Sequence, residues 1–189
     1  MKKLQLEIGT GNKILRTISS EVKPHEFAQY KSFANAMLKY VKNPKNRAVG
    51  LAAPQVGVNK RIFVAALMDD YSDTDFRVLV MINPTVKIHG TSTLEDEEGC
   101  LSLPGAFGTV KRWQSLTVDF VDINQKKYSL DLVGLSARII QHEFDHLNGL
   151  LYQDRMEENE EKIPLESITR EDQIAFLAEK SGKCCGGKH

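Results

Sequence analysis

The feature that most constrains the fold of this chain is the run HEFDH at residues 142–146, which follows the pattern HExxH. Residues four apart on an α-helix lie one turn apart on the same face, so His142 and His146 can reach one cation. The intervening Glu143 then faces water at that cation, which is typical of a metal-dependent hydrolase. Apolar residues on both sides predict that this helix faces the core and that its histidines are not two solvated side chains. They are Leu135, Ile139, Ile140, Leu147, Leu150 and Leu151.

A catalytic metal site of this type has three protein ligands and one open position, so a third ligand must come from elsewhere in the chain. Metzincin-type proteases continue as HExxHxxGxxH, and this chain has Gly149 but carries Tyr152 in place of the third histidine. That class is therefore excluded. Gluzincin-type proteases take a glutamate from a later helix, although an acidic run of this kind is more often a solvated face. The candidates are Glu157, Glu158, Glu160, Glu161 and Glu166.

Cys100 is the other candidate for the third ligand. It is the only cysteine in the main body of the chain, because Cys184 and Cys185 lie in a tail rich in glycine and lysine. A single cysteine is usually a small buried hydrophobic residue. Here it follows Glu98 and a glycine, which indicates a turn that presents a thiolate rather than the interior of a packed strand.

Three motifs occur in the order in which peptide deformylases carry them, and on these residues the chain resembles that family. They are GLAAPQ at residues 50–55, EGCLS at residues 98–102 and QHEFDH at residues 141–146. One departure lies two residues before Gly50, where the family usually has a glycine and this chain has Ala48, which bears on loop geometry rather than on the metal site. Similar segments extend the resemblance from about residue 10 to residue 155: 14–16, 20–22, 82–84, 110–112 and 146–149.

The resemblance implies a metal-dependent hydrolase that removes the formyl group from the N-terminal formyl-methionine of newly made polypeptides and releases formate. It implies one divalent cation on Cys100, His142 and His146, which would lower the pKa of bound water. Glu143 would take the proton and later deliver it to the leaving amine. The resemblance favours Fe(II) in the cell, while the ligand types also allow Zn, Ni or Co.

The same resemblance assigns roles in substrate binding. The Gln55 side-chain amide and the Leu101 backbone N–H would donate to the formyl oxygen as it gains charge. Val49 and Gly50 would pair with the peptide backbone as an added strand, which tolerates diverse sequences after the first residue.

The methionine side chain of the substrate is expected to enter an apolar pocket beside the metal. Arg138 lies one helical turn before His142, so it either borders the mouth of this pocket or is solvated. For the apolar members, an ordinary place in the core is the alternative. The residues expected to line the pocket are Val49, Leu135, Ile139 and the ring of His142.

Other functions also fit these residues. They are a HExxH peptidase with a downstream glutamate ligand, a formyl-peptide-binding protein without activity, and a thiol hydrolase with Cys100 as the nucleophile. An assay of formyl-methionyl peptides before and after chelation separates them.

Length and composition agree with a single soluble enzyme domain. At 189 residues the chain is long enough for one sizeable core and short for two. The 25 basic and 25 acidic residues give no net charge, so direct binding of nucleic acid or membrane is not expected. The expected partners are formyl-methionyl nascent peptides and, transiently, the ribosome. Residues 1–7 lack the apolar run of a signal peptide, and a thiolate ligand suits a reducing compartment, so the cytoplasm is the expected location.

Hydrophobic periodicity predicts an α+β fold with mainly antiparallel sheets around the motif helix, together with a C-terminal helix. Thr169 and Asp172 resemble a capping box that opens this helix, which would run to about Lys180. Residues 1–168 would then form the catalytic domain, and residues 169–189 the C-terminal helix and a flexible tail. A first helix is expected at residues 26–42, strands at 61–67, 78–82, 116–121 and 128–132, a loop at 68–76, and a hairpin turn at 122–125.

Overall fold

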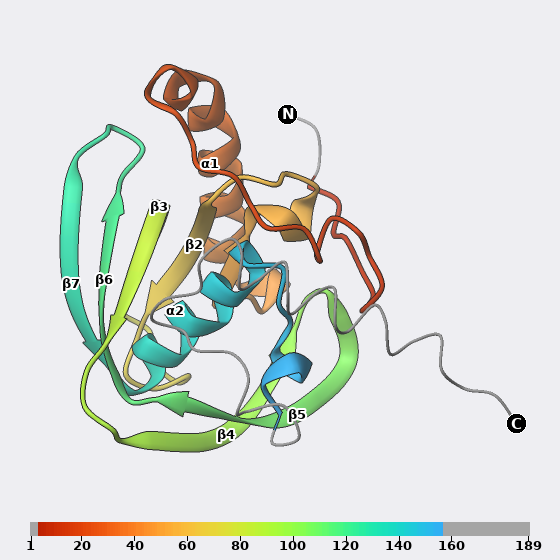
Figure 1. Cartoon of the computed structure of the whole chain (residues 1–189), viewed down its shortest axis with the longest axis vertical. Coiled ribbons are helices and arrows are strands. Elements are labelled where there is room, and N and C mark those ends of the chain that lie inside the picture. Colours follow the sequence, from red (N-terminus) through yellow and green to blue (C-terminus); the bar gives the residue numbers. More distant parts are fainter. Residues whose placement is uncertain (1–3, 157–189) are drawn as a thin grey trace, which may run out of the picture.

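The computed structural model describes residues 4–156, in which two antiparallel sheets lie around a central helix (Figure 1). The five-stranded sheet has the order β1-β2-β3-β6-β7, and the second sheet consists of β4 and β5. The strands are β1 (Gly50–Ala52), β2 (Ile62–Leu67), β3 (Arg77–Ile88), β4 (Thr93–Cys100), β5 (Leu103–Trp113), β6 (Ser115–Val121) and β7 (Lys127–Val133). The helices are α1 (Phe27–Lys42), α2 (Gly134–Leu147) and the 3-10 turns η1 (Pro24–Glu26), η2 (Pro44–Asn46), η3 (Ala53–Val56) and η4 (Tyr152–Arg155).

The expected α+β architecture is confirmed, and so are the first helix, the loop at residues 68–76 and the hairpin turn between β6 and β7. β3 continues six residues beyond the predicted strand, to Ile88. β4 and β5 were not predicted from the sequence. β4 reads TLEDEEGC and is exposed at four consecutive residues, while β5 begins with LPG, so neither strand carries the alternation that marks a half-buried strand. The C-terminal helix predicted after Thr169 lies outside the described residues.

The five-stranded sheet lies between the two helices, and β2 shows why. Its residues are buried on both faces: Ile62 and Val64 pack in the cluster that contains α1, and Phe63 and Ala65 pack in the cluster that contains α2. Side chains alternate between the two faces of a strand, so a strand covered on both sides needs a continuous apolar run. The sequence IFVAAL meets that need. Within the described residues, no helix is long and apolar enough to cross a membrane.

The end of α2 is fixed by a tight reversal. The Leu150 N–H donates to the Asp145 carbonyl at 3.0 Å, and Gly149 adopts a left-handed conformation with φ of 73°. A Cβ atom on Gly149 would lie 2.8 Å from the carbonyl oxygen of Arg16, which is closer than side chains approach backbone. The reversal therefore depends on glycine for both its backbone angle and its contact with the N-terminal segment.

We predict that Gly149→Ala destabilises the fold more than Gly90→Ala does. Gly90 has a similar φ of 69°, but a Cβ there would meet nothing within 4 Å. Strain in the left-handed region costs both variants about 1–2 kcal/mol, and the close contact adds about 1–3 kcal/mol for Gly149→Ala alone. Urea unfolding of both variants measures the difference, and equal losses would contradict the close approach to Arg16.

Candidate active site

The structure brings Cys100, His142 and His146 together between β4 and α2. Their ligand atoms all lie within 4.8 Å of one another, and Cys100 Sγ lies 3.3 Å from His146 Nε2. Cys100 is the last residue of β4, so the turn predicted around it begins one residue later, at Leu101. The two histidines are one turn apart on α2, as the spacing predicts. These three side chains could hold one metal ion.

Tyr152 occupies the place at which a metzincin would carry its third histidine. It is buried in η4, and its ring lies nearly parallel to that of His142, with an angle of 18° and a centroid distance of 6.4 Å. The glutamates that a gluzincin-type site would need, at residues 157–166, lie outside the described residues. Within residues 4–156, Cys100 is the residue that could supply a third ligand atom beside the two histidines.

A carboxylate fixes the orientation of His142. Its Nδ1 lies 2.9 Å from Glu98 Oε2, which leaves Nε2 on the side of Cys100. Carboxylates that hold the second nitrogen of a ligand histidine are a regular part of metal sites, because they set the ring orientation and raise its basicity. A thiolate and two imidazoles also match the preferences of Fe(II), Zn, Ni and Co. The donor set therefore fits a divalent cation.

The three candidate ligands are strongly coupled. Burial opposes ionisation of Cys100, but the charge of His146 and hydrogen bonds from both histidines outweigh it and lower the pKa of the thiol to about 5. Burial likewise opposes protonation of His142, yet its hydrogen bonds to Cys100 and Glu98 raise its pKa well above the usual value. The site without metal thus holds a thiolate beside a protonated imidazole, and a cation can take the place of that proton.

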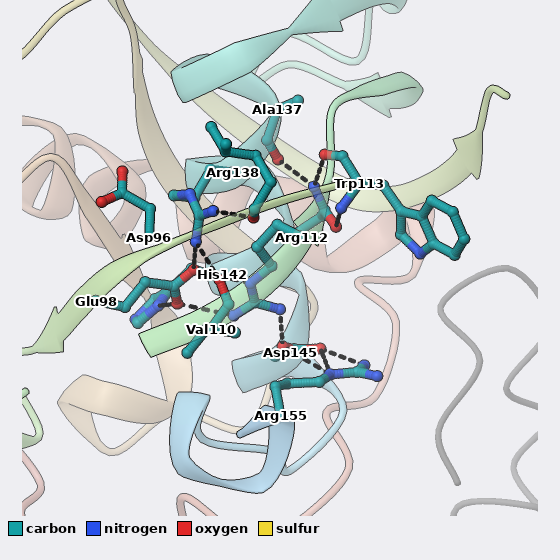
Figure 2. A network of polar contacts seen from close by, with 12 residues as sticks. Asp96, Glu98, Val110, Arg112, Trp113, Ala137, Arg138, His142, Asp145 and Arg155 are labelled. Atoms are coloured by element: carbon teal, nitrogen blue, oxygen red, sulfur yellow. Dashed lines mark hydrogen bonds and ion pairs between the residues drawn. The ribbon is translucent and has the colours of Figure 1, made fainter. Parts of the chain in front are cut away.

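Glu98 belongs to a buried network of charges, which Figure 2 shows. Arg112 makes two bonds of 2.9 Å to the Glu98 carboxylate, and Arg138 adds one of 2.7 Å. On its other side, Arg112 donates to Asp145 at 2.6 Å, and Arg155 donates to the same carboxylate at 2.7 Å. Burial opposes ionisation of Glu98, but the charge and hydrogen bonds of Arg112 hold its pKa far below the usual range. An ionised Glu98 only accepts, so the Nδ1 of His142 must donate.

Two positions were expected for Arg138, at the mouth of the pocket or in solvent, and the solvated position is wrong. Its side chain is buried, and besides Glu98 it donates to the carbonyl oxygens of Val110 at 3.0 Å and Leu94 at 2.6 Å. From this buried position it lines a cavity that Cys100, His142 and Glu143 also line. Sequence patterns missed the role of Glu98, because its partners Arg112, Arg138 and His142 are 14, 40 and 44 residues away.

Glu143 carries a buried carboxyl group, one oxygen of which lacks a hydrogen-bond partner among the described residues. The residue is 4% exposed, and the oxygen without a partner is Oε2. Burial raises its pKa to about 7, although the neighbouring histidines oppose that shift. A Cβ atom on Gly50 would lie 2.1 Å from Glu143 Oε1, so only glycine at that position leaves room for the carboxylate. A carboxyl group that titrates near neutral pH can both take and give a proton.

Gln55 is oriented by its own 3-10 turn, η3. Its side-chain oxygen accepts from the Ala52 N–H at 2.8 Å. Its Nε2 therefore points the other way, 3.4 Å from Cys100 Sγ and 3.3 Å from Ser102 Oγ. The amide donor thus lies beside the candidate ligand Cys100.

One cavity of about 650 Å³ collects most of the predicted site residues. Leu135 does not line it and instead borders a neighbouring cavity of about 310 Å³, with Arg138 lining both. His146 does not line the cavity and is 1% exposed. The predicted residues that line the larger cavity are Val49, Gly50, Gln55, Cys100, Leu101, Arg138, Ile139, His142 and Glu143.

Comparison with known proteins gives one consistent result. A family model described as Polypeptide deformylase matches residues 7–162. Peptide deformylase 2 of Gloeobacter violaceus is 37% identical over 147 residues, which cover 78% of this chain and 76% of that protein. The peptide deformylase of Treponema pallidum (strain Nichols) is 36% identical over 148 residues, or 78% of this chain and 85% of that protein.

Solved structures show the same similarity. A peptide deformylase from Acinetobacter baumannii with Met-Ala-Ser bound has a TM-score of 0.72 and 32% identity, covering 81% of this chain and 98% of that chain. A peptide deformylase from Synechococcus elongatus in complex with actinonin has a TM-score of 0.70 and 32% identity, covering 96% of this chain and 87% of that chain.

We predict that Cys100 in the metal-free protein ionises with a midpoint near pH 5, far below the usual thiol value of about 8.5. The thiolate persists above this pH and is lost as the pH falls through it. The pH dependence of iodoacetamide alkylation, followed on the Cys100 peptide by mass spectrometry, measures the midpoint. His146→Ala should shift it upward, because the charge of His146 is removed. A midpoint near 8.5 in the parent protein would contradict the coupling.

Proposed function

The chain belongs to the polypeptide deformylase family, and we propose that it uses one divalent cation on Cys100, His142 and His146 to carry out the family's reaction. The protein is a hydrolase that removes the N-terminal formyl group of newly made polypeptides. The observation that carries the proposed ligand set is the approach of the three ligand atoms to within 4.8 Å of one another. We favour Fe(II) as the cellular metal, with Zn, Ni or Co as substitutes that the same ligands accept.

When bound, the cation supplies Lewis acidity, which makes water nucleophilic near neutral pH. Glu143 is proposed to take the proton from that water as it attacks the formyl carbon, and then to deliver it to the leaving amine. Its buried position and its pKa of about 7 support this role, because a carboxylate with an ordinary pKa is a weaker base and would take the proton less readily. Gly50 supports it by leaving room for the carboxylate.

Gln55 and Leu101 are proposed to stabilise the formyl oxygen as it becomes negatively charged. The contact of the Gln55 oxygen with the Ala52 N–H keeps its amide donor turned toward the cavity side of Cys100. Leu101 borders the same cavity directly after Cys100, where its backbone N–H is the second proposed donor. Loss of one such donor typically costs about 3 kcal/mol of transition-state stabilisation.

The peptide is proposed to bind as an added strand along Val49 and Gly50, where β1 forms an edge of the five-stranded sheet. Its methionine side chain would then lie against Val49, Ile139 and the ring of His142. Arg138 forms a wall of the same cavity, whereas Leu135 borders only the neighbouring cavity and has no proposed contact with the methionine side chain. Met-Ala-Ser bound to the A. baumannii structure is consistent with such a substrate.

Three wider expectations remain proposals. A transient contact with the ribosome would place the enzyme near its substrates, without direct binding of nucleic acid or membrane. A cytoplasmic location would keep the Cys100 thiol reduced. The division into a catalytic domain at residues 1–168 and a C-terminal helix and tail at residues 169–189 concerns a boundary outside the described residues.

We predict that the purified protein releases formate from formyl-methionyl peptides and loses this activity on chelation. Fe(II), Ni(II) or Co(II) should restore it, because the ligand set leaves a position for water. Formate release with one bound metal per chain is the measurement. An internal peptide bond is the control substrate and should stay intact. Full activity in protein shown to be free of metal would contradict the proposal.

A formyl-Met peptide should exceed the matching formyl-Ala peptide at least about tenfold in kcat/KM. Each methylene or sulfur placed in an apolar pocket contributes about 1 kcal/mol, and methionine adds several of these groups. Initial rates at low substrate concentration measure the ratio directly. Equal rates for the two peptides would show that the cavity holds no pocket for the first side chain.

A further inference from the structure

Three large apolar side chains at the catalytic cavity are mostly exposed. Ile8 is 54% exposed, Tyr71 is 60% exposed and Phe107 is 66% exposed, and all three line the cavity of about 650 Å³. We call these three residues the apolar collar. They come from three separate segments: the N-terminal segment, the loop between β2 and β3, and strand β5. Exposed apolar residues that gather at one opening mark a binding surface, whereas single scattered ones carry no such meaning.

Phe107 is fixed next to the candidate metal ligands. It pairs with Gly99 in the register of β4 and β5, and Gly99 directly precedes Cys100. A Cβ atom on Gly99 would lie 2.7 Å from Phe107 Cε1, so the ring contacts the backbone of the EGCLS motif. The glycine thus lets the aromatic ring reach the edge of the site.

Ile8 is held across the two motif loops. The Glu7 N–H donates to the Gln55 carbonyl at 2.8 Å, and the Gly9 N–H donates to the Ser102 carbonyl at 3.0 Å. Residues on both sides of Ile8 are therefore tied to η3, which carries Gln55, and to the turn that follows Cys100. Because the backbone on both sides of Ile8 is held in place, less conformational entropy is lost when this segment binds a ligand than if it were mobile.

Tyr71 is presented by a tight acidic turn. The Asp73 carboxylate accepts from the backbone N–H groups of Asp69 and Asp70, at 2.8 and 3.0 Å. Partial burial, followed by the carboxylates of Glu98 and Asp96, raises the pKa of the Tyr71 phenol, in agreement with its place on the cavity wall. The loop predicted at residues 68–76 therefore contributes to the site, which its sequence does not reveal.

We propose that the apolar collar binds the side chains of the second and third residues of the formylated peptide and favours apolar or aromatic residues there. This rests on the proposed function, because the formyl group and the first residue must occupy the interior beside Cys100. The following residues then pass the mouth of the cavity, where their side chains alternate in direction and can meet the collar on different sides. Two exposed charged residues also line the cavity, Arg47 and Glu97, and their opposite signs favour neither cationic nor anionic side chains.

The test compares formyl-Met-Leu-Phe with formyl-Met-Ser-Asn as substrates of the metal-loaded protein. We expect kcat/KM to be at least about tenfold higher for the apolar peptide, mainly through KM, since the gain comes from burial of apolar surface. Ile8→Ala, Tyr71→Ala and Phe107→Ala should each lower this ratio about three- to tenfold. Each variant should lower kcat/KM for formyl-Met-Ser-Asn less than for formyl-Met-Leu-Phe, and Phe107→Tyr should keep the parent ratio.

The chain offers a matched control for each variant. Val133, Tyr128 and Phe76 are 65%, 36% and 39% exposed, and none of them lines the cavity. Val133→Ala, Tyr128→Ala and Phe76→Ala should therefore leave the ratio unchanged. Metal content and Tm of all variants show whether a loss reflects a damaged site.

Several outcomes would overturn the collar. One is that the collar variants and the controls remain active and show the same ratio of kcat/KM between the two peptides. Another is an equal loss on both peptides, which would show a structural role. A change in oligomeric state without a change in ratio would show that the collar meets a second copy of the chain. Failure to release formate from either peptide would instead overturn the proposed function, and the collar with it.

Discussion

The buried carboxylate of Glu98 is the interaction on which the fold and the site both depend. It comes from β4, accepts from Arg112 on β5, and accepts from Arg138 and His142 on α2. The same group therefore attaches the two-stranded sheet to the central helix and orients one of the candidate ligands. Removal of one partner from a buried ion pair typically costs about 3–5 kcal/mol, because the remaining charge is left without compensation. We expect few substitutions at this position to leave the geometry of the site intact.

Close packing around glycines is the second constraint. Gly50 leaves room for the Glu143 carboxylate, and Gly99 leaves room for the Phe107 ring. A side chain at Gly50 would displace the Glu143 carboxylate, which the proposed mechanism needs. A side chain at Gly99 would displace the Phe107 ring, which belongs to the apolar collar. The glycines of the motifs thus act through the space they leave, in addition to any freedom of the backbone.

Sequence patterns named residues that the structure brings together at the candidate site, but missed some of the elements that carry them. The helical spacing of His142 and His146 can be read directly, because a helix converts sequence distance into position on a face. β4 could not be predicted, because its exposed acidic residues look like a solvated loop and its pairing with β5 is a tertiary contact. The burial of Arg138 escaped prediction for a similar reason: its compensating partner, Glu98, is 40 residues away.

The proposed division between three ligands and one proton carrier is tested most directly by metal content and kcat of Glu143→Ala, measured on the same preparation. Glu143 does not belong to the group of three residues whose ligand atoms lie within 4.8 Å of one another, so metal content should remain that of the parent. The kcat should fall on the order of 10²–10⁴-fold, the usual loss for general acid–base catalysis. His146→Ala is the control and should lose both metal and activity. If Glu143→Ala were purified without metal, Glu143 would be a ligand and the proposed mechanism would be wrong.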